Sequence, residues 1–311
     1  MKAHHLLAFI LLIACASPEE SAKLPTLDLW NEPVKTKLTE FVAAAIVDVP
    51  VEERLAVFDF DGTIGCEKPD YMEVIVAMNQ LCKEAEKDPT LLSDSLYIAA
   101  CAYDYDYINK VVYQAILAAF LDYNQSAYRD SVKVATSSLL HPKFKKHYSQ
   151  LYYAPMYQLI RYLKHYHFTV YFVSGSEEGF LRAYGENYLD MSPKHIIGSS
   201  VEVSYYDTLG RSFFKRDSAY LEPLAYGPGK AELIENHIGI SPILAFGNTM
   251  GDYEMLTYAS TSTYPNLSLI LVHDDPDEYV YYDSTLIQKA QENNWVEVKM
   301  KQDFVKVFEW E

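Results

Sequence analysis

The segment from Leu55 to Ile64, LAVFDFDGTI, constrains the fold of this chain more than any other. Its apolar half is short, bounded and rich in Val, Leu and Phe, which predicts a fully buried strand of a parallel sheet. Asp59 and Asp61 follow directly, and acids at such a strand end are costly unless a cation or hydrogen bonds compensate them. Ligands of open α/β sheets bind just beyond the carboxyl ends of the strands. We therefore expect a site that holds a cation and attacks phosphorus, rather than the alternative of a surface Asp-x-Asp-Gly turn.

Three later segments place polar residues at a strand end or a helix start. They are residues 168–176, ending in Ser-Gly-Ser; residues 227–230, Gly-Pro-Gly-Lys; and residues 243–252, ending in Gly-Asn-Thr-Met-Gly-Asp. Together with the first segment and in this order, they resemble the four signature motifs of the haloacid dehalogenase (HAD) superfamily. The resemblance implies an α/β fold with a Rossmann-like three-layer parallel sheet and an inserted helical cap of the C1 type.

The resemblance also implies a role for each matching residue. Asp59 would be the nucleophile that forms an aspartyl-phosphate. Asp61 would protonate the leaving oxygen and then activate water. The lysine of the third motif would neutralise the nucleophile and the phosphate as a point charge. The phosphoryl group would be bound by Thr63, Ser174, Gly175 and Lys230.

Mg²⁺ is the cofactor that the resemblance implies, with Asp59, Asp61 and the fourth motif as its ligands. The chain departs here from many relatives, because Asn248 stands where they have an acid, while Asp252 is retained. An Asn side chain offers a hard oxygen without a charge. Either Asn248 binds the metal through that oxygen or Asp252 contributes more, and we expect weakened metal binding.

The hundred residues between the first and second motifs have helical rather than strand spacing. From residue 165 onward we expect strands to alternate with helices in the α/β manner. The expected helices cover residues 36–47, a segment beginning at Met72, residues 108–121 and residues 152–163, and a further strand covers 261–272. The expected domains are a core of residues 24–64 and 165–311 and a helical cap of residues 65–164.

A cap of this kind would close over the site and choose the substrate. Glu67, just inside the cap hinge, is the polar residue best placed to meet a substrate amine. Seven tyrosines crowd into the expected cap, and they could form an aromatic cage for a cation or pack cap helices with their hydroxyls outward. These are Tyr97, Tyr103, Tyr105, Tyr107, Tyr113, Tyr123 and Tyr128.

The first residues indicate export. Residues 1–14 contain an apolar stretch too short for a membrane span and suited to a signal peptide. Leu12-Ile13-Ala14-Cys15 resembles a bacterial lipobox, in which cleavage leaves an acylated cysteine; a plain signal peptide with a chance cysteine is the alternative. Residues 15–23 would be a polar tether. We expect an exported periplasmic or cell-surface lipoprotein that meets a membrane only through Cys15.

Charge and cysteine content narrow the partners. A net charge of −17 argues against nucleic acid, since binding to a phosphate backbone needs a basic surface. Apart from Cys15 the chain has Cys66, Cys82 and Cys101, and an odd number cannot form a closed disulfide framework. At most one bridge is expected, with Cys82–Cys101 the easier pairing because Cys66 closely follows the first motif.

The leading hypothesis is a Mg²⁺-dependent phosphatase for small phosphomonoesters, similar to an exported bacterial branch of phosphoserine phosphatase-like HAD hydrolases. Its partner would be a small phosphorylated metabolite. A haloalkanoate dehalogenase is disfavoured because it needs no leaving-group acid such as Asp61. A phosphomutase uses the same two aspartates. A lipid-anchored binding protein on a catalytically weakened scaffold would be consistent with Asn248.

Overall fold

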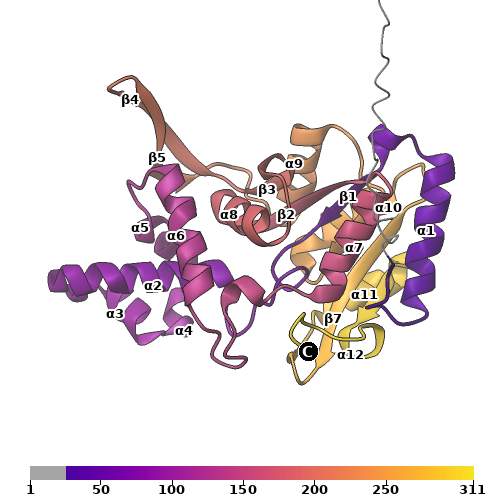
Figure 1. Cartoon of the computed structure of the whole chain (residues 1–311), viewed down its shortest axis with the longest axis horizontal. Coiled ribbons are helices and arrows are strands. Elements are labelled where there is room, and N and C mark those ends of the chain that lie inside the picture. Colours follow the sequence, from indigo (N-terminus) through magenta and orange to yellow (C-terminus); the bar gives the residue numbers. More distant parts are fainter. Residues whose placement is uncertain (1–25) are drawn as a thin grey trace, which may run out of the picture.

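The computed structural model describes residues 26–311 and has a central sheet of seven strands (Figure 1). Its order is β3-β2-β1-β6-β7-β8, and β9 also pairs with β7. All pairings are parallel except that of β8 with β7. The strands are β1 (Leu55–Phe58), β2 (Thr169–Glu177), β3 (Ile196–Ser199), β6 (Leu244–Gly247), β7 (Leu267–Asp275), β8 (Tyr279–Tyr281) and β9 (Val296–Lys299). The expected α/β class is confirmed.

Alternation along β1 divides the core into two layers, because successive side chains of a strand point to opposite faces. Ala56 and Phe58 join one hydrophobic cluster, whereas Leu55 and Val57 join another. Helices α1 (Val34–Asp48) and α7 (Ala154–His165) contribute to the first cluster. The second includes side chains of α9 (Pro228–Ile238), α10 (Tyr253–Ser260) and α11 (Ser284–Asn293). The sheet is therefore covered on both faces, as a three-layer fold requires.

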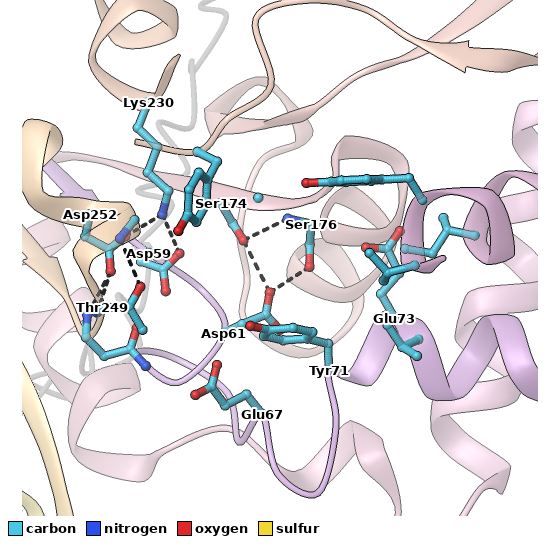
Figure 2. Close-up of a pocket in the computed structure, with 18 residues that line it drawn as sticks. Asp59, Asp61, Glu67, Tyr71, Glu73, Ser174, Ser176, Lys230, Thr249 and Asp252 are labelled. Atoms are coloured by element: carbon cyan, nitrogen blue, oxygen red, sulfur yellow. Dashed lines mark hydrogen bonds and ion pairs between the residues drawn. The ribbon is translucent and has the colours of Figure 1, made fainter. Parts of the chain in front are cut away.

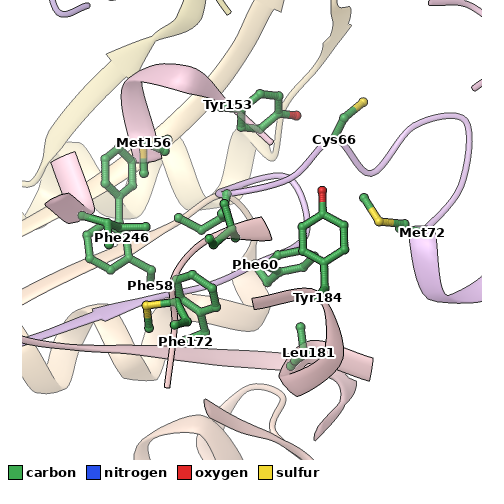
Figure 3. Packing of buried hydrophobic residues seen from close by; sticks show 14 of the residues in the cluster. Phe58, Phe60, Cys66, Met72, Tyr153, Met156, Phe172, Leu181, Tyr184 and Phe246 are labelled. Carbon is green, nitrogen blue, oxygen red and sulfur yellow. The ribbon is translucent and has the colours of Figure 1, made fainter. Parts of the chain in front are cut away.

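Aromatic rings dominate the first cluster near the end of β1 (Figure 3). Phe60 lies between the rings of Phe172 and Tyr184, with ring centroids 6.0 and 5.3 Å away. It is almost fully buried and stands between Asp59 and Asp61 in the chain. Its packing fixes the backbone from which both acids project. α8 (Glu178–Tyr188), which carries Tyr184, continues directly from β2.

Helices α2–α6 form the inserted cap beside the sheet (Figure 1). They are α2 (Met72–Lys87), α3 (Ser95–Ala102), α4 (Tyr105–Ile108), α5 (Val112–Ala119) and α6 (Gln125–Ser138). The chain leaves and re-enters the core at one place, where Gly65 forms a bridge with Tyr152. Helix α7 lies inside the range 65–164 expected for the cap, yet it contacts β2 and packs in the core.

A hairpin of β4 (Val201–Thr208) and β5 (Arg211–Tyr220) follows β3 directly, so the expected alternation of strands and helices is wrong there. Leu209 and Gly210 form its turn with φ values of 55° and 72°, the left-handed geometry that suits tight hairpins. The hairpin reaches the cap, because the Arg216 N–H donates to the carbonyl of Tyr123 at 2.8 Å. The cap region is thus built from two separate segments of the chain.

Two other element predictions are wrong in their bounds. The single helix expected over 108–121 is interrupted, because α4 ends at Ile108 and α5 begins at Val112. The strand expected to begin at residue 261 begins at Leu267. Turn hydrogen bonds from the Asn266 side chain to the carbonyls of Ser262 and Tyr264 occupy the segment before it.

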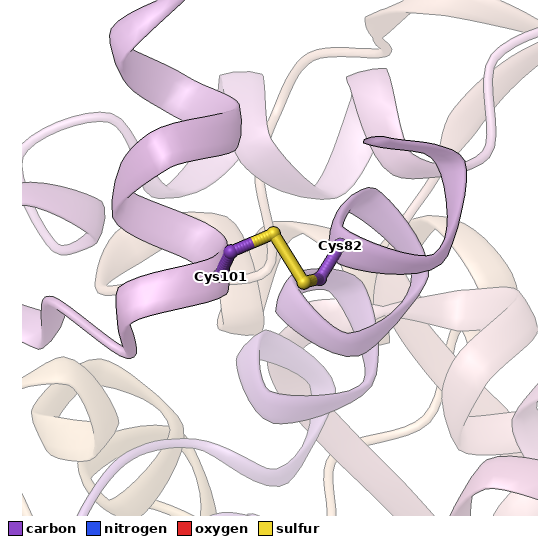
Figure 4. The surroundings of a disulfide bond; sticks show 2 residues. All are labelled: Cys82 and Cys101. Atoms are coloured by element: carbon purple, nitrogen blue, oxygen red, sulfur yellow. A yellow bond between two sulfur atoms is a disulfide. The ribbon is translucent and has the colours of Figure 1, made fainter. Parts of the chain in front are cut away.

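Cys82 and Cys101 form a disulfide that joins α2 to α3 (Figure 4). This confirms the pairing favoured by the sequence, and Cys66 is a buried free thiol. No helix within residues 26–311 has both the length and the apolar composition to cross a bilayer. The expected signal peptide, the tether and Cys15 lie outside the described residues.

Candidate active site

The first two acids and the fourth motif meet because their strands are neighbours. β1 lies between β2 and β6, with Phe58 level with both Phe172 and Phe246. Since parallel strands end at the same edge of the sheet, Asp59, Ser174 and Asn248 lie around one cavity (Figure 2). The cavity has a volume of about 190 Å³ and opens between the sheet edge and the cap.

Lys230, in the first turn of α9, joins two of the predicted residues. Its Nζ donates to Asp59 Oδ1 and to Asp252 Oδ1, each at 2.6 Å, and all three side chains are buried. Burial alone would lower the pKa of Lys230, but the carboxylates of Asp252 and Asp59 raise it above its usual value. Lys230 is therefore a fixed positive charge beside Asp59.

Asp59 nevertheless lacks full compensation. Burial raises its pKa well above the usual value, and the charge of Asp252 adds to this effect while Lys230 opposes it. One ammonium thus faces two buried carboxylates, with Asp61 close by. The carboxylates around Asp59 outnumber the positive charges, so a bound cation would stabilise the ionised form of Asp59.

Asp61 is held by two serines of β2. Its Oδ2 accepts from Ser176 Oγ at 2.6 Å and from Ser174 Oγ at 3.3 Å. Burial raises the pKa of Asp61 to about 6, although the hydrogen bond from Ser176 opposes the shift. A carboxyl with this pKa exchanges a proton readily near neutral pH, which suits a general acid and base.

The fourth motif is folded around Asp252. The N–H groups of Asn248 and Thr249 donate to Asp252 Oδ2 at 2.9 and 3.0 Å. A Cβ on Gly247 would come within 2.5 Å of the Asp252 side chain, so glycine is needed there. Both Asp252 oxygens are therefore engaged by the protein. Asp252 orders the loop and Lys230, whichever atoms bind a metal.

Asn248 approaches the first motif at Gly62. Gly62 has φ of +72°, and a Cβ there would lie 2.0 Å from Asn248 Nδ2. That Nδ2 is buried and has no hydrogen-bond partner in the described part of the chain. Thr63 Oγ1 lies 3.5 Å from Asn248 Oδ1.

Thr63 itself is fully buried and does not line the cavity. Its hydroxyl lies next to Asn248, where it can position that side chain, and its contact with the phosphoryl group stays a prediction. Gly175 and Ser174 do line the cavity.

The residues predicted to bind Mg²⁺ fit a hard cation in kind, since all of them offer oxygens: the carboxylates of Asp59 and Asp252, the backbone carbonyl of Asp61 and the amide of Asn248. The unpartnered amide of Asn248 fits a ligand at this place, because a half-turn about χ2 exchanges its nitrogen and oxygen. Within residues 26–311, no group of three or more His, Cys, Asp or Glu side chains could hold a metal ion unaided.

Two buried residues outside the cavity support the loop of the first motif. His273 Nε2 lies 2.7 Å from the Gly62 carbonyl, and its Nδ1 lies 3.2 Å from Glu278 Oε2. His273 and Glu278 are both buried. They hold the loop between Asp61 and Thr63 from the side opposite the cavity, at β7 and the turn after it.

Sequence reasoning missed Ser176 and Glu73 as cavity-lining residues. Ser176 could have been found, because residues two apart on a strand share a face and Ser174 was already assigned. Glu73 carried no local signal, since it lies in an apolar helix that happens to face the site. Glu67, which was predicted, does line the cavity.

The site combines three features at the edge of a parallel sheet: a buried acid held by a lysine, a second acid with a raised pKa, and a Gly-rich loop. Such a combination is typical of hydrolases that act on phosphoryl groups. A family model described as haloacid dehalogenase-like hydrolase matches residues 56–257. The chain belongs to this family, which confirms the predicted superfamily and an enzyme of the hydrolase class.

Solved structures agree on the fold. A conserved protein of unknown function from Anaerococcus prevotii is 16% identical with a TM-score of 0.59, covering 88% of this chain and 94% of its own. A protein of unknown function from Bordetella pertussis is 11% identical with a TM-score of 0.54, covering 79% and 98%. At these identities the likeness extends to the fold alone. A search of curated proteins finds no significant match.

Proposed function

We propose that the protein is a Mg²⁺-dependent phosphatase that hydrolyses small phosphomonoesters through an aspartyl-phosphate. The observation that carries the proposal is the pair of acids in one cavity. Asp59 is fixed by Lys230 at 2.6 Å, while Asp61 is fixed by Ser176 at 2.6 Å and has its pKa raised to about 6. One is thus held beside a positive charge, and the other is able to give and take a proton.

In the first step a carboxylate oxygen of Asp59 attacks phosphorus, and the bond from phosphorus to the ester oxygen breaks. Asp61 donates its proton to that leaving oxygen. In the second step Asp61 takes a proton from water, whose oxygen attacks phosphorus and releases Asp59 and phosphate. Lys230 stays charged throughout and offsets the negative charge of the phosphoryl group.

Bound Mg²⁺ would supply further charge stabilisation to the phosphoryl oxygens. Asp59, the Asp61 carbonyl and the Asn248 amide oxygen would hold it, with Asp252 ordering the loop. The shortage of positive charge around Asp59 supports this cofactor.

The test is phosphate release from a panel of phosphomonoesters, with Mg²⁺ and with chelator. We expect Mg²⁺-dependent release by the wild type and none above background by Asp59→Asn, which keeps the shape but cannot form the acyl phosphate. Hydrolysis that is equal in both proteins would overturn the proposal. Phosphoryl transfer to a second substrate without net phosphate release would point instead to a mutase.

We also propose that the protein is exported and anchored by lipid at Cys15. The Cys82–Cys101 bond supports an oxidising compartment, where disulfides persist. Wild type should partition with membranes after export and Cys15→Ser should not, since a lipoprotein terminus carries several acyl chains. Wild-type protein that stays in the aqueous fraction would reject the anchor.

A further inference from the structure

The cavity continues from the two catalytic acids into the cap, and its far end is acidic and aromatic. Its walls there come from Tyr71, Glu73, Val112, Tyr113 and Ile116. Figure 2 shows Glu73 on the opposite side of Asp61 from Lys230, with Tyr71 between the two acids. A leaving group joined to a phosphoryl unit at Asp59 would extend in this direction.

Glu73 is an unusual residue for such a wall. It lies in the first turn of α2 and is only 4% exposed. Its Oε2 accepts from the Glu177 N–H at 3.0 Å, while Oε1 has no hydrogen-bond partner within residues 26–311. A buried carboxyl with one unpartnered oxygen lowers the stability of the folded protein unless a ligand donates a hydrogen bond to that oxygen.

Arg216 is the buried cation whose charge acts on Glu73; its Nη1 is engaged elsewhere, while its Nε and Nη2 have no hydrogen-bond partner within residues 26–311. Arg216 of the hairpin donates to Glu177 Oε1 at 3.0 Å and stacks over the ring of Tyr128 at 3.8 Å. Burial raises the pKa of Glu73 to about 8, and the charge of Glu177 adds to the shift. The charge of Arg216 opposes this rise only in part, and no cation forms a salt bridge with Glu73 in the described part of the chain.

No basic side chain of the described residues lines the far end of the cavity. Among the described residues that line the cavity, Lys230 is the one basic side chain, and it is bound to Asp59 and Asp252. Glu73 has no salt-bridge partner within the described residues, although the charge of Arg216 opposes the rise of its pKa. With a pKa of about 8, Glu73 is mostly protonated in the free protein at neutral pH; an ammonium group beside it would stabilise the ionised carboxylate and be bound by it, whereas a carboxylate or a second phosphate would find no partner there.

We propose that Glu73 binds an ammonium group, so that the enzyme selects phosphate esters of small amino alcohols that carry no carboxylate. This rests on the proposed phosphatase function. The cavity, with a volume of about 190 Å³, has room for a phosphoryl group and a short chain. The rings of Tyr71 and Tyr113 offer faces that attract cations and tolerate methylene groups.

Three esters of similar length but different charge test the proposal: 2-aminoethyl phosphate, propyl phosphate and phosphoglycolate. For the wild type we expect kcat/KM for 2-aminoethyl phosphate to exceed that for propyl phosphate at least tenfold, with phosphoglycolate slowest. Phosphoserine should fall below 2-aminoethyl phosphate, since no lining cation receives its carboxylate. Equal rates on the amine and the neutral ester would overturn the proposal.

Glu73→Gln should reduce the ratio of the amine to the neutral ester at least tenfold, mainly through KM of the amine. Glu86→Gln removes the same charge from an exposed position of α2 and should leave the ratio as in the wild type. If Glu73 only stabilises the cap, for example through Arg216, both esters should lose activity equally and the ratio should persist; that result rejects the proposal. If Glu73→Gln does not fold, the proposal is tested by the wild type alone, through the ratio of kcat/KM for 2-aminoethyl phosphate to that for propyl phosphate.

The controls separate this inference from the function on which it rests. If no ester releases phosphate through Asp59, the proposed function itself fails. If Asp59-dependent hydrolysis occurs without preference for the amine, the phosphatase stands and only the ammonium site is wrong.

Discussion

At the scale of single residues, the departure at Asn248 is the clearest feature of this chain. The loop keeps its shape because Asp252 accepts two backbone hydrogen bonds and holds Lys230. Asn248 contributes an amide beside Gly62 but no charge. We therefore expect metal affinity and loop order to depend on different residues of one motif.

Substitutions in this motif should separate the two roles. Asn248→Asp should lower the Mg²⁺ concentration for half-maximal activity by about tenfold, because one added charge faces the cation. Asp252→Ala should be far worse than Asn248→Ala, since Lys230 loses a partner and the loop loses two hydrogen bonds. Titration of activity with Mg²⁺ measures all three. Equal losses in the two alanine variants, or no gain in the aspartate variant, would contradict the assignment.

Ser176 should tune the proton transfer of Asp61. The first chemical step needs Asp61 protonated, so kcat/KM should fall as pH rises through about 6. The hydrogen bond from Ser176 stabilises the ionised carboxylate and so lowers the pKa of Asp61. In Ser176→Ala the fall in kcat/KM should therefore occur at higher pH. A pH–rate profile of both proteins tests it. If kcat/KM of the variant falls at the same pH as that of the wild type, or at a lower pH, Ser176 does not act on Asp61 in this way.

At the scale of elements, the sequence was most informative where chemistry follows a hydrophobic strand. Asp59, Ser174 and Asn248 were predicted because buried strands are recognisable and parallel strands bring their ends together. Lys230 was found in the same way, at a helix start. The β4–β5 hairpin was missed because its turn, Leu209-Gly210, has an apolar first residue that is not typical of tight turns.

The contacts that depend on distant segments could not be predicted. Arg216 packs between the hairpin, the cap and the end of β2, which no local pattern indicates. The resemblance assigns Thr63 to the phosphoryl group, but it gave no sign that the hydroxyl would lie next to Asn248. Whether Glu73 faces solvent, core or cavity depends on how the cap sits on the sheet.

The disulfide should stabilise the cap. Cys82 and Cys101 are 19 residues apart, and a loop of this size restricts the unfolded chain enough to contribute about 3 kcal/mol. Replacing both cysteines by serine should lower the free energy of unfolding by about that amount in urea titrations. Reduced wild type should unfold like the double variant. Equal stability of oxidised and reduced wild type would show that the bridge carries no stabilising constraint.

At the scale of the whole molecule, the cap and core meet through buried charge, and this should make stability depend on pH. Glu73 has an ordinary pKa of 4.5 and a folded pKa of about 8. Between these values the folded protein binds more protons than the unfolded chain, so the free energy of unfolding should fall as pH rises. The effect is on the order of a few kcal/mol.

Glu73→Gln removes that titration. The free energy of unfolding of the variant, relative to wild type, should therefore rise between pH 5 and pH 8.5. Urea unfolding of both proteins at the two pH values measures the difference, with Glu86→Gln as the matched control. Parallel pH dependences in wild type and Glu73→Gln would show that the Glu73 carboxyl does not change its protonation on folding in this range.

The central claim is that Asp59 carries the phosphoryl group during turnover. The most direct measurement is a single turnover with an ester labelled in its phosphoryl group, stopped in acid and analysed by peptide mapping. We predict label on the peptide that contains Asp59, its loss on further incubation with water, and no label in Asp59→Asn. Turnover in which phosphate is released while label never appears on Asp59, or in which Asp59→Asn remains fully active, would contradict the account.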